Sequence, residues 1–354
     1  MLNFIRYLLL PFSVIYTIIT WSRNKLYDLN LLKSKSFNIP IIVVGNLAVG
    51  GTGKSPMVEY ILRVVNPLLK VTVLSRGYGR KTKGFRYVHE TDEAIHVGDE
   101  PLQIKRKFKD NTVVVCENRI CAIEKIKGET DAVLLDDAYQ HRKLKPTFSI
   151  LLFDYHSLNK PIITLPTGNF RDTLLQSKRA NIIVVTKSPS EINDAKKRYI
   201  LNRLKKHTNA PVFFSEIAYQ SLLTPSKKET DLRFFLDSHA ILLTGIANPA
   251  PLYTYLLEKV KSITPIKFPD HHDFSKIDLL KIERLFDNLP SKKIIITTEK
   301  DIQRLPQDFV TKLPIYYIPI QQRILFDQSE EFDTLIKRAK SNRFRSSNIQ
   351  KNTF

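Results

Sequence analysis

The feature that most constrains the fold is a series of short, uninterrupted apolar runs. They occupy residues 40–45, 71–75, 112–116, 132–137, 149–154 and 181–186. Runs of Val, Ile and Leu without alternating polar residues are typical of strands buried on both faces, and helical patterns separate them here. The sequence therefore predicts an α/β fold with a parallel sheet flanked by helices. In such sheets, ligands collect at the carboxyl ends of the strands.

A lysine-rich helical stretch is followed by an apolar run at residues 211–219 and a polar segment, and then by a second set of apolar runs at residues 240–245, 293–298 and 315–320. We interpret it as a smaller α/β domain. The chain is then expected to have four parts: an N-terminal hydrophobic helix over 1–30, a core over 31–205, the smaller domain over 206–340 and a basic tail over 341–354.

The first apolar run leads into a glycine-rich turn, GNLAVGGTGKSP (45–56), and then into a helical pattern. This context fits a P-loop, GxxxxGK[ST], whose backbone N–H groups surround phosphate oxygens. The first glycine position holds Ala48, and Gly50 and Gly51 supply flexibility next to it. We predict a P-loop NTPase-type sheet whose nucleotide phosphates bind residues Ala48, Val49, Gly50, Gly51, Thr52, Gly53, Lys54 and Ser55.

A P-loop also needs a carboxylate for Mg²⁺, and the run AVLLDDAYQH ends in Asp136 and Asp137. Such an acid at the end of a buried strand is the Walker B arrangement, in which the metal bridges phosphate oxygens. The alternative is that one aspartate only caps the following helix. We predict that Ser55, Asp136 and Asp137 form the metal site.

Two loops after strands are candidates for binding the acceptor of a phosphate. The segment SRGYGRKTKG (75–84) carries Arg76 and further basic residues around Tyr78, which suits an anionic substrate; a solvated basic loop is the alternative. In HVGDEPLQI (96–104), Asp99 precedes a proline at an expected helix start. It is either a simple N-cap or a general base.

The segment PDHHDF (269–274) in the second domain is a further candidate. Adjacent histidines cannot share one helix face, so one of them facing the cleft fits better than a metal pair. A surface loop is the alternative.

The N-terminus holds a charge-free stretch, YLLLPFSVIYTIITW, over residues 7–21, between Arg6 and Arg23. It is shorter than the roughly 20 apolar residues that cross a bilayer. The bulky, charged sequence after it offers no signal-peptide cleavage site. We expect an uncleaved helix in the membrane interface, with basic neighbours on anionic lipid. The alternative is a helix buried in the core.

The formal net charge is +20, from 55 Lys and Arg against 35 Asp and Glu, so the protein attracts anions. Nucleic acid is not expected as the partner, because interleaved aromatic and basic clusters on a recognisable module are missing. Cys116 and Cys121 form neither a CxxC pair nor part of a metal cluster, and we expect two small apolar side chains in a reducing compartment.

Five motifs occur in a fixed order: VVGNLAVGGTGKSP, VLSRGYGR, VGDEP, VLLDDAYQH and PDHHDF. Together they resemble the tetraacyldisaccharide 4'-kinases, the lipid A 4'-kinases of Gram-negative bacteria, over nearly the whole chain. The family usually has Thr at the position of Ser55 and Gly at that of Ala138. The first difference keeps the hydroxyl group, and the second adds a methyl group at a turn.

The resemblance implies transfer of the ATP γ-phosphate to the 4'-hydroxyl of a tetraacyl glucosamine disaccharide 1-phosphate, at the cytoplasmic face of the inner membrane. It implies that Lys54 and Ser55 bind phosphates and Mg²⁺ beside Asp136 and Asp137. Asp99 becomes the base rather than a cap. The remaining implied roles belong to His271, which orients the base with His272 as the fallback, and to Arg76, Tyr78, Arg119 and His141, which line the headgroup or nucleotide.

Rival protein classes fit less well. A membrane-associated switch ATPase has a similar P-loop, but its usual extra lysine would fall at Val49. A GTPase needs an Asp where VVTKSPS has Pro189. The switch ATPase stays the alternative function, and dependence of ATP consumption on a phosphoglycolipid acceptor separates the two.

Overall fold

The computed structural model describes residues 6–339, and its larger sheet has nine strands in the order β15-β8-β7-β6-β1-β5-β2-β4-β3. Its strands are β1 (Ile41–Asn46), β2 (Val71–Ser75), β3 (Arg86–Tyr87), β4 (Thr112–Val115), β5 (Ala132–Asp136), β6 (Phe148–Asp154), β7 (Ile182–Thr186), β8 (Val212–Tyr219) and β15 (Ile320–Ile324). Neighbours from β8 to β4 pair in parallel, and the short β3 and β15 pair antiparallel at the two edges. The predicted parallel α/β sheet is confirmed.

Helices cover both faces of this sheet. They are α2 (Leu10–Asp28), α3 (Lys54–Val65), α4 (Ala94–Val97), α5 (Asp99–Lys107), α6 (Arg119–Ile126), α7 (Asp194–Lys205) and α11 (Ser329–Arg338), with short 3-10 turns η1 (Ser157–Asn159) and η2 (Leu174–Arg179). Alternate residues of β1 enter two separate cores: Val43 packs with side chains of α6 and α7, and Val44 with those of α3 and α11. Burial on both faces explains why β1 reads as one continuous apolar run.

The smaller sheet has six strands in the order β10-β9-β14-β13-β11-β12. They are β9 (Leu222–Leu223), β10 (Glu229–Thr230), β11 (His239–Thr244), β12 (Ser262–Lys267), β13 (Lys293–Thr298) and β14 (Ile315–Ile318). Around them lie α8 (Ala250–Leu256), α9 (Lys276–Asp287), α10 (Gln307–Lys312), η3 (Leu232–Phe235) and η4 (Asp301–Gln303). Side chains of α8 share one core with this sheet, and those of α9 and α10 share another.

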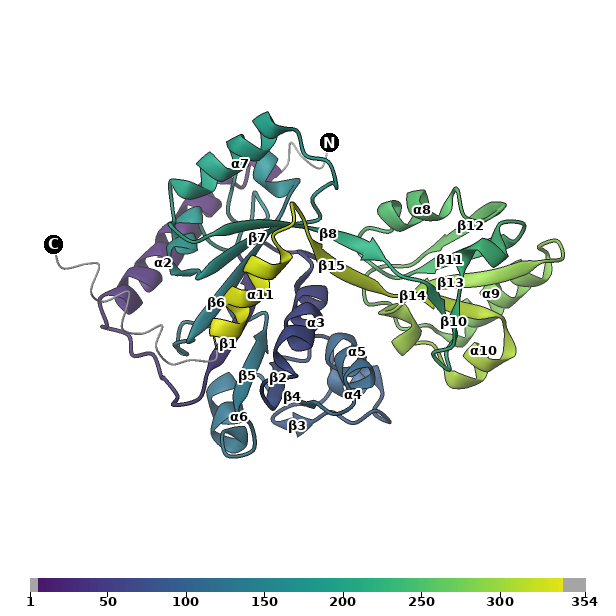
Figure 1. Ribbon diagram of the computed structural model, residues 1–354, viewed down its shortest axis with the longest axis horizontal. Coiled ribbons are helices and arrows are strands. Elements are labelled where there is room, and N and C mark those ends of the chain that lie inside the picture. Colours follow the sequence, from purple (N-terminus) through teal and green to yellow (C-terminus); the bar gives the residue numbers. More distant parts are fainter. Residues whose placement is uncertain (1–5, 340–354) are drawn as a thin grey trace.

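Figure 1 shows the two sheets as separate lobes, with β8 and β15 running between them. Both strands, and α11 after them, belong to the larger lobe. The sheets therefore divide the chain differently from the boundary predicted between residues 205 and 206. Strand β8 follows that boundary but pairs with β7 in the first sheet, and the chain returns to this sheet again after β14. The tail predicted over 341–354 lies outside the described residues.

Helix α2 attaches to the larger lobe through its polar side chains. The Ser13 hydroxyl donates to the carbonyl of Thr164 at 3.1 Å, and the Asn24 amide donates to Asp172 at 2.7 Å. The apolar side chains face outward, with Phe12 60% and Ile19 63% exposed. The alternative of a helix buried in the core is therefore wrong. Across residues 6–339, each helix is too short or too polar to cross a membrane.

Candidate active site

The glycine-rich turn follows β1 and ends where α3 begins. Gly53 precedes the helix with φ 79°, a conformation that favours glycine. Within the described chain, no side chain caps this helix start, so its first N–H groups can bind an anion. Two side chains from other strands fix the backbone of the turn. The Thr186 hydroxyl donates to the carbonyl of Thr52 at 2.8 Å, and the Gln322 amide donates to the carbonyl of Gly53 at 3.3 Å.

The backbone at the start of the turn, at residues 47–49, is already hydrogen-bonded to another segment of the chain. The N–H of Val49 donates to the carbonyl of Asn169 at 2.7 Å, and the N–H of Arg171 donates to the carbonyl of Leu47 at 2.7 Å. Ala48 is buried between them in an antiparallel bridge. The prediction that Val49 binds phosphate through its amide is therefore corrected, since this N–H is already paired. Residues 50–55 form the open part of the turn.

The predicted acids lie beside Lys54, as the parallel order of β1 and β5 requires. Asp137 Oδ2 is 3.8 Å from Lys54 Nζ and 3.5 Å from Arg171 Nη1. Asp136 is buried at the end of β5, and its Oδ1 has no hydrogen-bond partner among residues 6–339. Burial, followed by the nearby Glu100 carboxylate, raises the pKa of Asp136. An orphaned carboxylate oxygen at this end of the sheet suits a hard cation such as Mg²⁺.

Asp99 begins α5 and meets the smaller lobe. Its Oδ2 lies 2.8 Å from His271 Nδ1, and its Oδ1 accepts from Arg304 Nε at 2.8 Å. The N-cap of α5 is Gly98, whose φ of 91° lets the chain pass close to Tyr78. Because the Asp99 side chain caps nothing there, the simple N-cap interpretation is wrong. The structure brings together Asp99 and His271, which lie 172 residues apart.

His272 has a structural place. Its ring stacks on Phe268 at 4.4 Å, and its Nε2 is 3.0 Å from Asp278, which completes the capping box of α9. The ring of Tyr78 meets His271 edge-on at 5.3 Å. The fallback choice of His272 as the partner of Asp99 is therefore not supported. The alternative that residues 269–274 form only a surface loop is also not supported, because His271 contacts Asp99.

The other predicted binding residues lie around the same acids. Arg119 is buried, and its pKa is lowered by burial and then by Arg76, while Asp137 and Asp136 act in the opposite direction. His141 is half-buried, and burial followed by Arg119 lowers its pKa. Its Nε2 has no partner in the described chain. Arg76 and Tyr78 are exposed.

Sequence reasoning missed four charged residues of this site: Glu100, Arg171, Lys300 and Arg304. Glu100 directly follows Asp99 and could have been found from that position. Arg171 lies in a segment without a motif, and only its pairing with the phosphate turn reveals it. Lys300 and Arg304 come from the turn after β13, far along the chain.

The larger lobe and its phosphate turn define a P-loop nucleotide-binding protein, and comparisons with known proteins narrow this class. The family model described as tetraacyldisaccharide-1-P 4'-kinase matches residues 5–340. A tetraacyldisaccharide 4'-kinase from Flavobacterium johnsoniae is 40% identical over 338 residues, which cover 95% of this chain and 97% of the relative. One from Phocaeicola vulgatus is 39% identical, with 93% of each chain covered.

Among solved structures, the crystal structure of LpxK from Aquifex aeolicus in complex with ATP superposes with a TM-score of 0.75 at 29% identity. The match covers 95% of this chain and all of that one. The chain belongs to the tetraacyldisaccharide-1-P 4'-kinase family, as its ordered motifs predict.

Proposed function

We propose that this protein transfers the γ-phosphate of ATP to the 4'-hydroxyl of a tetraacyl glucosamine disaccharide 1-phosphate in lipid A biosynthesis. The contact between Asp99 of the larger lobe and His271 of the smaller lobe carries the proposal. The contact supports Asp99 as a buried proton acceptor, which a phosphotransferase needs and simple nucleotide binding does not. Family membership supports the same chemistry.

Different residues of the site are assigned to phosphate binding, metal binding and proton transfer. N–H groups of residues 50–55 and the Lys54 ammonium bind the phosphates, while Ser55 and Asp136, with Asp137 beside them, would hold Mg²⁺. Bound Mg²⁺ supplies charge neutralisation on the phosphate oxygens. Asp99 takes the proton of the acceptor hydroxyl, whose oxygen then forms the new bond to phosphorus as ADP leaves. Positioning and electrostatics supply most of the rate in such transfers.

The acceptor headgroup is assigned to the basic residues at the opening of the site. Arg76 and Arg119 provide guanidinium groups, which suit phosphate oxygens because of their fork geometry. Tyr78 and His141 add an aromatic surface and a free ring nitrogen beside them. The net charge of +20 favours approach of an anionic substrate.

Membrane attachment is assigned to α2, and the site is placed at the cytoplasmic face of the inner membrane. Helix α2 lies at the side of the larger lobe away from the smaller lobe (Figure 1), and its apolar side chains, such as Phe12 and Ile19, are exposed. A helix with this exposed face lies in the interface, and basic neighbours such as Arg23 strengthen binding to anionic lipids. Lipid substrate and enzyme then meet in two dimensions.

We expect a triple variant, Phe12→Ser, Ile15→Ser and Ile19→Ser, to lose most of its binding to liposomes with anionic lipid. These side chains are more than half exposed, so the fold stays intact, whereas deleting residues 1–25 would also remove the bonds of Ser13 and Asn24. Co-sedimentation measures the bound fraction, and Phe234→Ser, an 80% exposed residue of the smaller lobe, is the control. Unchanged partitioning of the triple variant would refute the anchor.

The transfer itself is tested by mass spectrometry of a tetraacyl disaccharide 1-phosphate incubated with enzyme and Mg·ATP. One added phosphate on the lipid is the expected product. A switch ATPase, the alternative, would release phosphate equally well without the lipid and leave its mass unchanged.

A further inference from the structure

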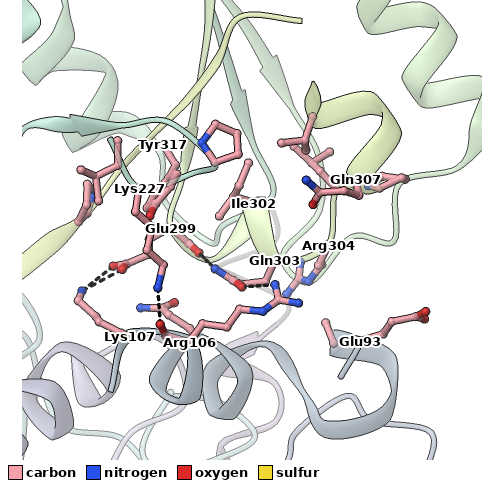
Figure 2. A pocket seen from close by; sticks show the side chains of 18 of the residues that line it. Glu93, Arg106, Lys107, Lys227, Glu299, Ile302, Gln303, Arg304, Gln307 and Tyr317 are labelled. Carbon is pink, nitrogen blue, oxygen red and sulfur yellow. Dashed lines mark hydrogen bonds and ion pairs between the residues drawn. The ribbon is translucent and has the colours of Figure 1, made fainter. Parts of the chain in front are cut away.

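One face of α5 is held along its length by the segment that contains η4. Gln303 accepts a hydrogen bond from Arg106 at 2.7 Å, and both oxygens of Glu299 lie 2.9 Å from Lys107 Nζ. At the other end of the helix, Arg304 binds Asp99. Figure 2 shows the contacts of Lys107 with Glu299 and of Arg106 with Gln303 at the edge of a cavity of about 1080 Å³ between the lobes, with Arg304 nearby. We call residues 299–304 the α5 clamp.

Arg304 is the member of the α5 clamp that reaches the reacting carboxylate. Its Nε binds Oδ1 of Asp99 at 2.8 Å, and its Nη2 binds Oδ2, so the planar guanidinium fixes the orientation of the carboxylate. Only 4% of the Arg304 side chain is exposed. Burial lowers the pKa of Arg304 to about 10, which keeps it cationic at neutral pH. A buried guanidinium is stable only when it is paired, and the Asp99 carboxylate is the partner of Arg304 here.

Lys300 fixes the other partner of Asp99. Its Nζ lies 2.9 Å from Nε2 of His271. An ammonium group can only donate, so Nε2 accepts. Nδ1 lies 2.8 Å from the acceptor Oδ2 of Asp99 and also 2.8 Å from Nη2 of Arg304, a donor. Because Nη2 also binds Oδ2 of Asp99, both donors meet at the carboxylate, and the ring proton is assigned to Nδ1. That N–H then points at Oδ2 of Asp99, 2.8 Å away. Burial, followed by Lys300, lowers the pKa of His271, which agrees with a neutral ring.

These contacts use up most of the carboxylate. A carboxylate offers about four lone-pair positions. His271 and Arg304 Nη2 take those of Oδ2, and Arg304 Nε takes one of Oδ1. Among residues 6–339, the contacts at Asp99 therefore leave one position, on Oδ1. An acceptor hydroxyl that approaches this position meets the proton acceptor in a single orientation.

We propose that Arg304 and Lys300 are positioning residues of the phosphoryl transfer: Arg304 aims the free lone pair of Asp99 at the acceptor hydroxyl, and Lys300 sets the histidine tautomer that supports it. The inference rests on the proposed function, because it takes Asp99 as the base. It gives the smaller lobe a role in the chemistry beyond holding His271.

The first test replaces Arg304 with Gln and with Lys, and follows kcat/KM against pH. Without the adjacent cation, Arg304→Gln is expected to move the acidic limb of the profile upward by about 1 to 3 pH units. Arg304→Lys keeps the charge but not the fork, so its limb stays near that of the wild type while kcat falls by about 10- to 100-fold. The position of the limb does not depend on how much of the enzyme is folded.

Arg233→Gln is the matched control, because Arg233 forks onto Asp231 in the same lobe but is largely exposed. Its profile should equal that of the wild type. A limb that stays in place in Arg304→Gln, or an unchanged kcat in Arg304→Lys, overturns the role of Arg304. If the wild-type enzyme adds no phosphate to the glycolipid, the proposed function fails instead.

The second test concerns Lys300. Lys300→Met removes the donor to Nε2 and is expected to lower kcat by about 10-fold with the KM for ATP unchanged, as for other residues that orient a functional histidine. Lys300→Gln keeps an N–H donor and should recover part of the loss. Equal kcat values for the Met and Gln variants would show that the histidine tautomer does not depend on residue 300.

Discussion

Asp99→Ala is expected to lower kcat by about 10²- to 10⁴-fold, the range that a well-placed general base supplies. The affinity for ATP should stay near that of the wild type, because Asp99 faces the smaller lobe and touches none of residues 50–55. Lys54→Ala should behave differently and weaken both ATP binding and turnover, since Lys54 lies in the phosphate turn beside Asp137. Single-turnover kinetics and nucleotide titration separate the two effects.

Asp99→Asn accompanies this variant, because alanine leaves the Arg304 charge buried without its partner. Asp110→Ala, an exposed aspartate shortly after α5, controls for the general effect of removing a carboxylate nearby. Wild-type turnover in both Asp99 variants would remove the base assignment.

Asp136→Asn is expected to abolish most activity and at the same time to stabilise the nucleotide-free protein. In the folded protein, burial and Glu100 raise the pKa of Asp136 above its ordinary value of 3.8. The stability that the protonated group contributes is full below pH 3.8 and is lost as the pH rises toward the folded pKa. Asparagine needs no proton, so its advantage in melting temperature should grow from pH 5 to pH 8.

Mg·ATP provides the complementary measurement. It should raise the melting temperature of the wild type, whose orphaned Asp136 oxygen can bind the metal, and raise that of Asp136→Asn much less. Asp131→Asn is a suitable comparison, because Asp131 is exposed just before β5. An Asp136→Asn protein that is less stable than the wild type at pH 8 would contradict this account.

The core of the fold could be predicted because β1, β5, β6 and β7 are buried on both faces and so appear as continuous apolar runs. The missed strands lack this signal. β12 has a proline and exposed positions at a sheet edge, and β15 has the polar sequence IQQRI. Because β15 was not recognised, the return of the chain to the first sheet could not be foreseen.

The site was predictable where the residues belong to one local motif. The glycine-rich turn and the paired acids each directly follow an apolar run, and in the structure these two strands, β1 and β5, pair in parallel. Arg304 pairs with Asp99 across the lobes, 205 residues away, and Lys300 pairs with His271 within the smaller lobe, 29 residues away. No local pattern encodes that distance. The polar face by which α2 attaches to the larger lobe could not be predicted for the same reason, because the hydrogen-bond partners of Ser13 and Asn24 lie about 150 residues away.

The hydrogen bonds of α2 determine which of its side chains meet water. Hydrogen bonds at Ser13, Tyr16 and Asn24 hold the helix in one rotation, so it cannot roll over and hide its apolar side chains. In plain buffer those side chains must meet one another between molecules or be covered by detergent. Because these bonds keep the apolar side chains of α2 exposed, we expect the protein to self-associate in detergent-free buffer.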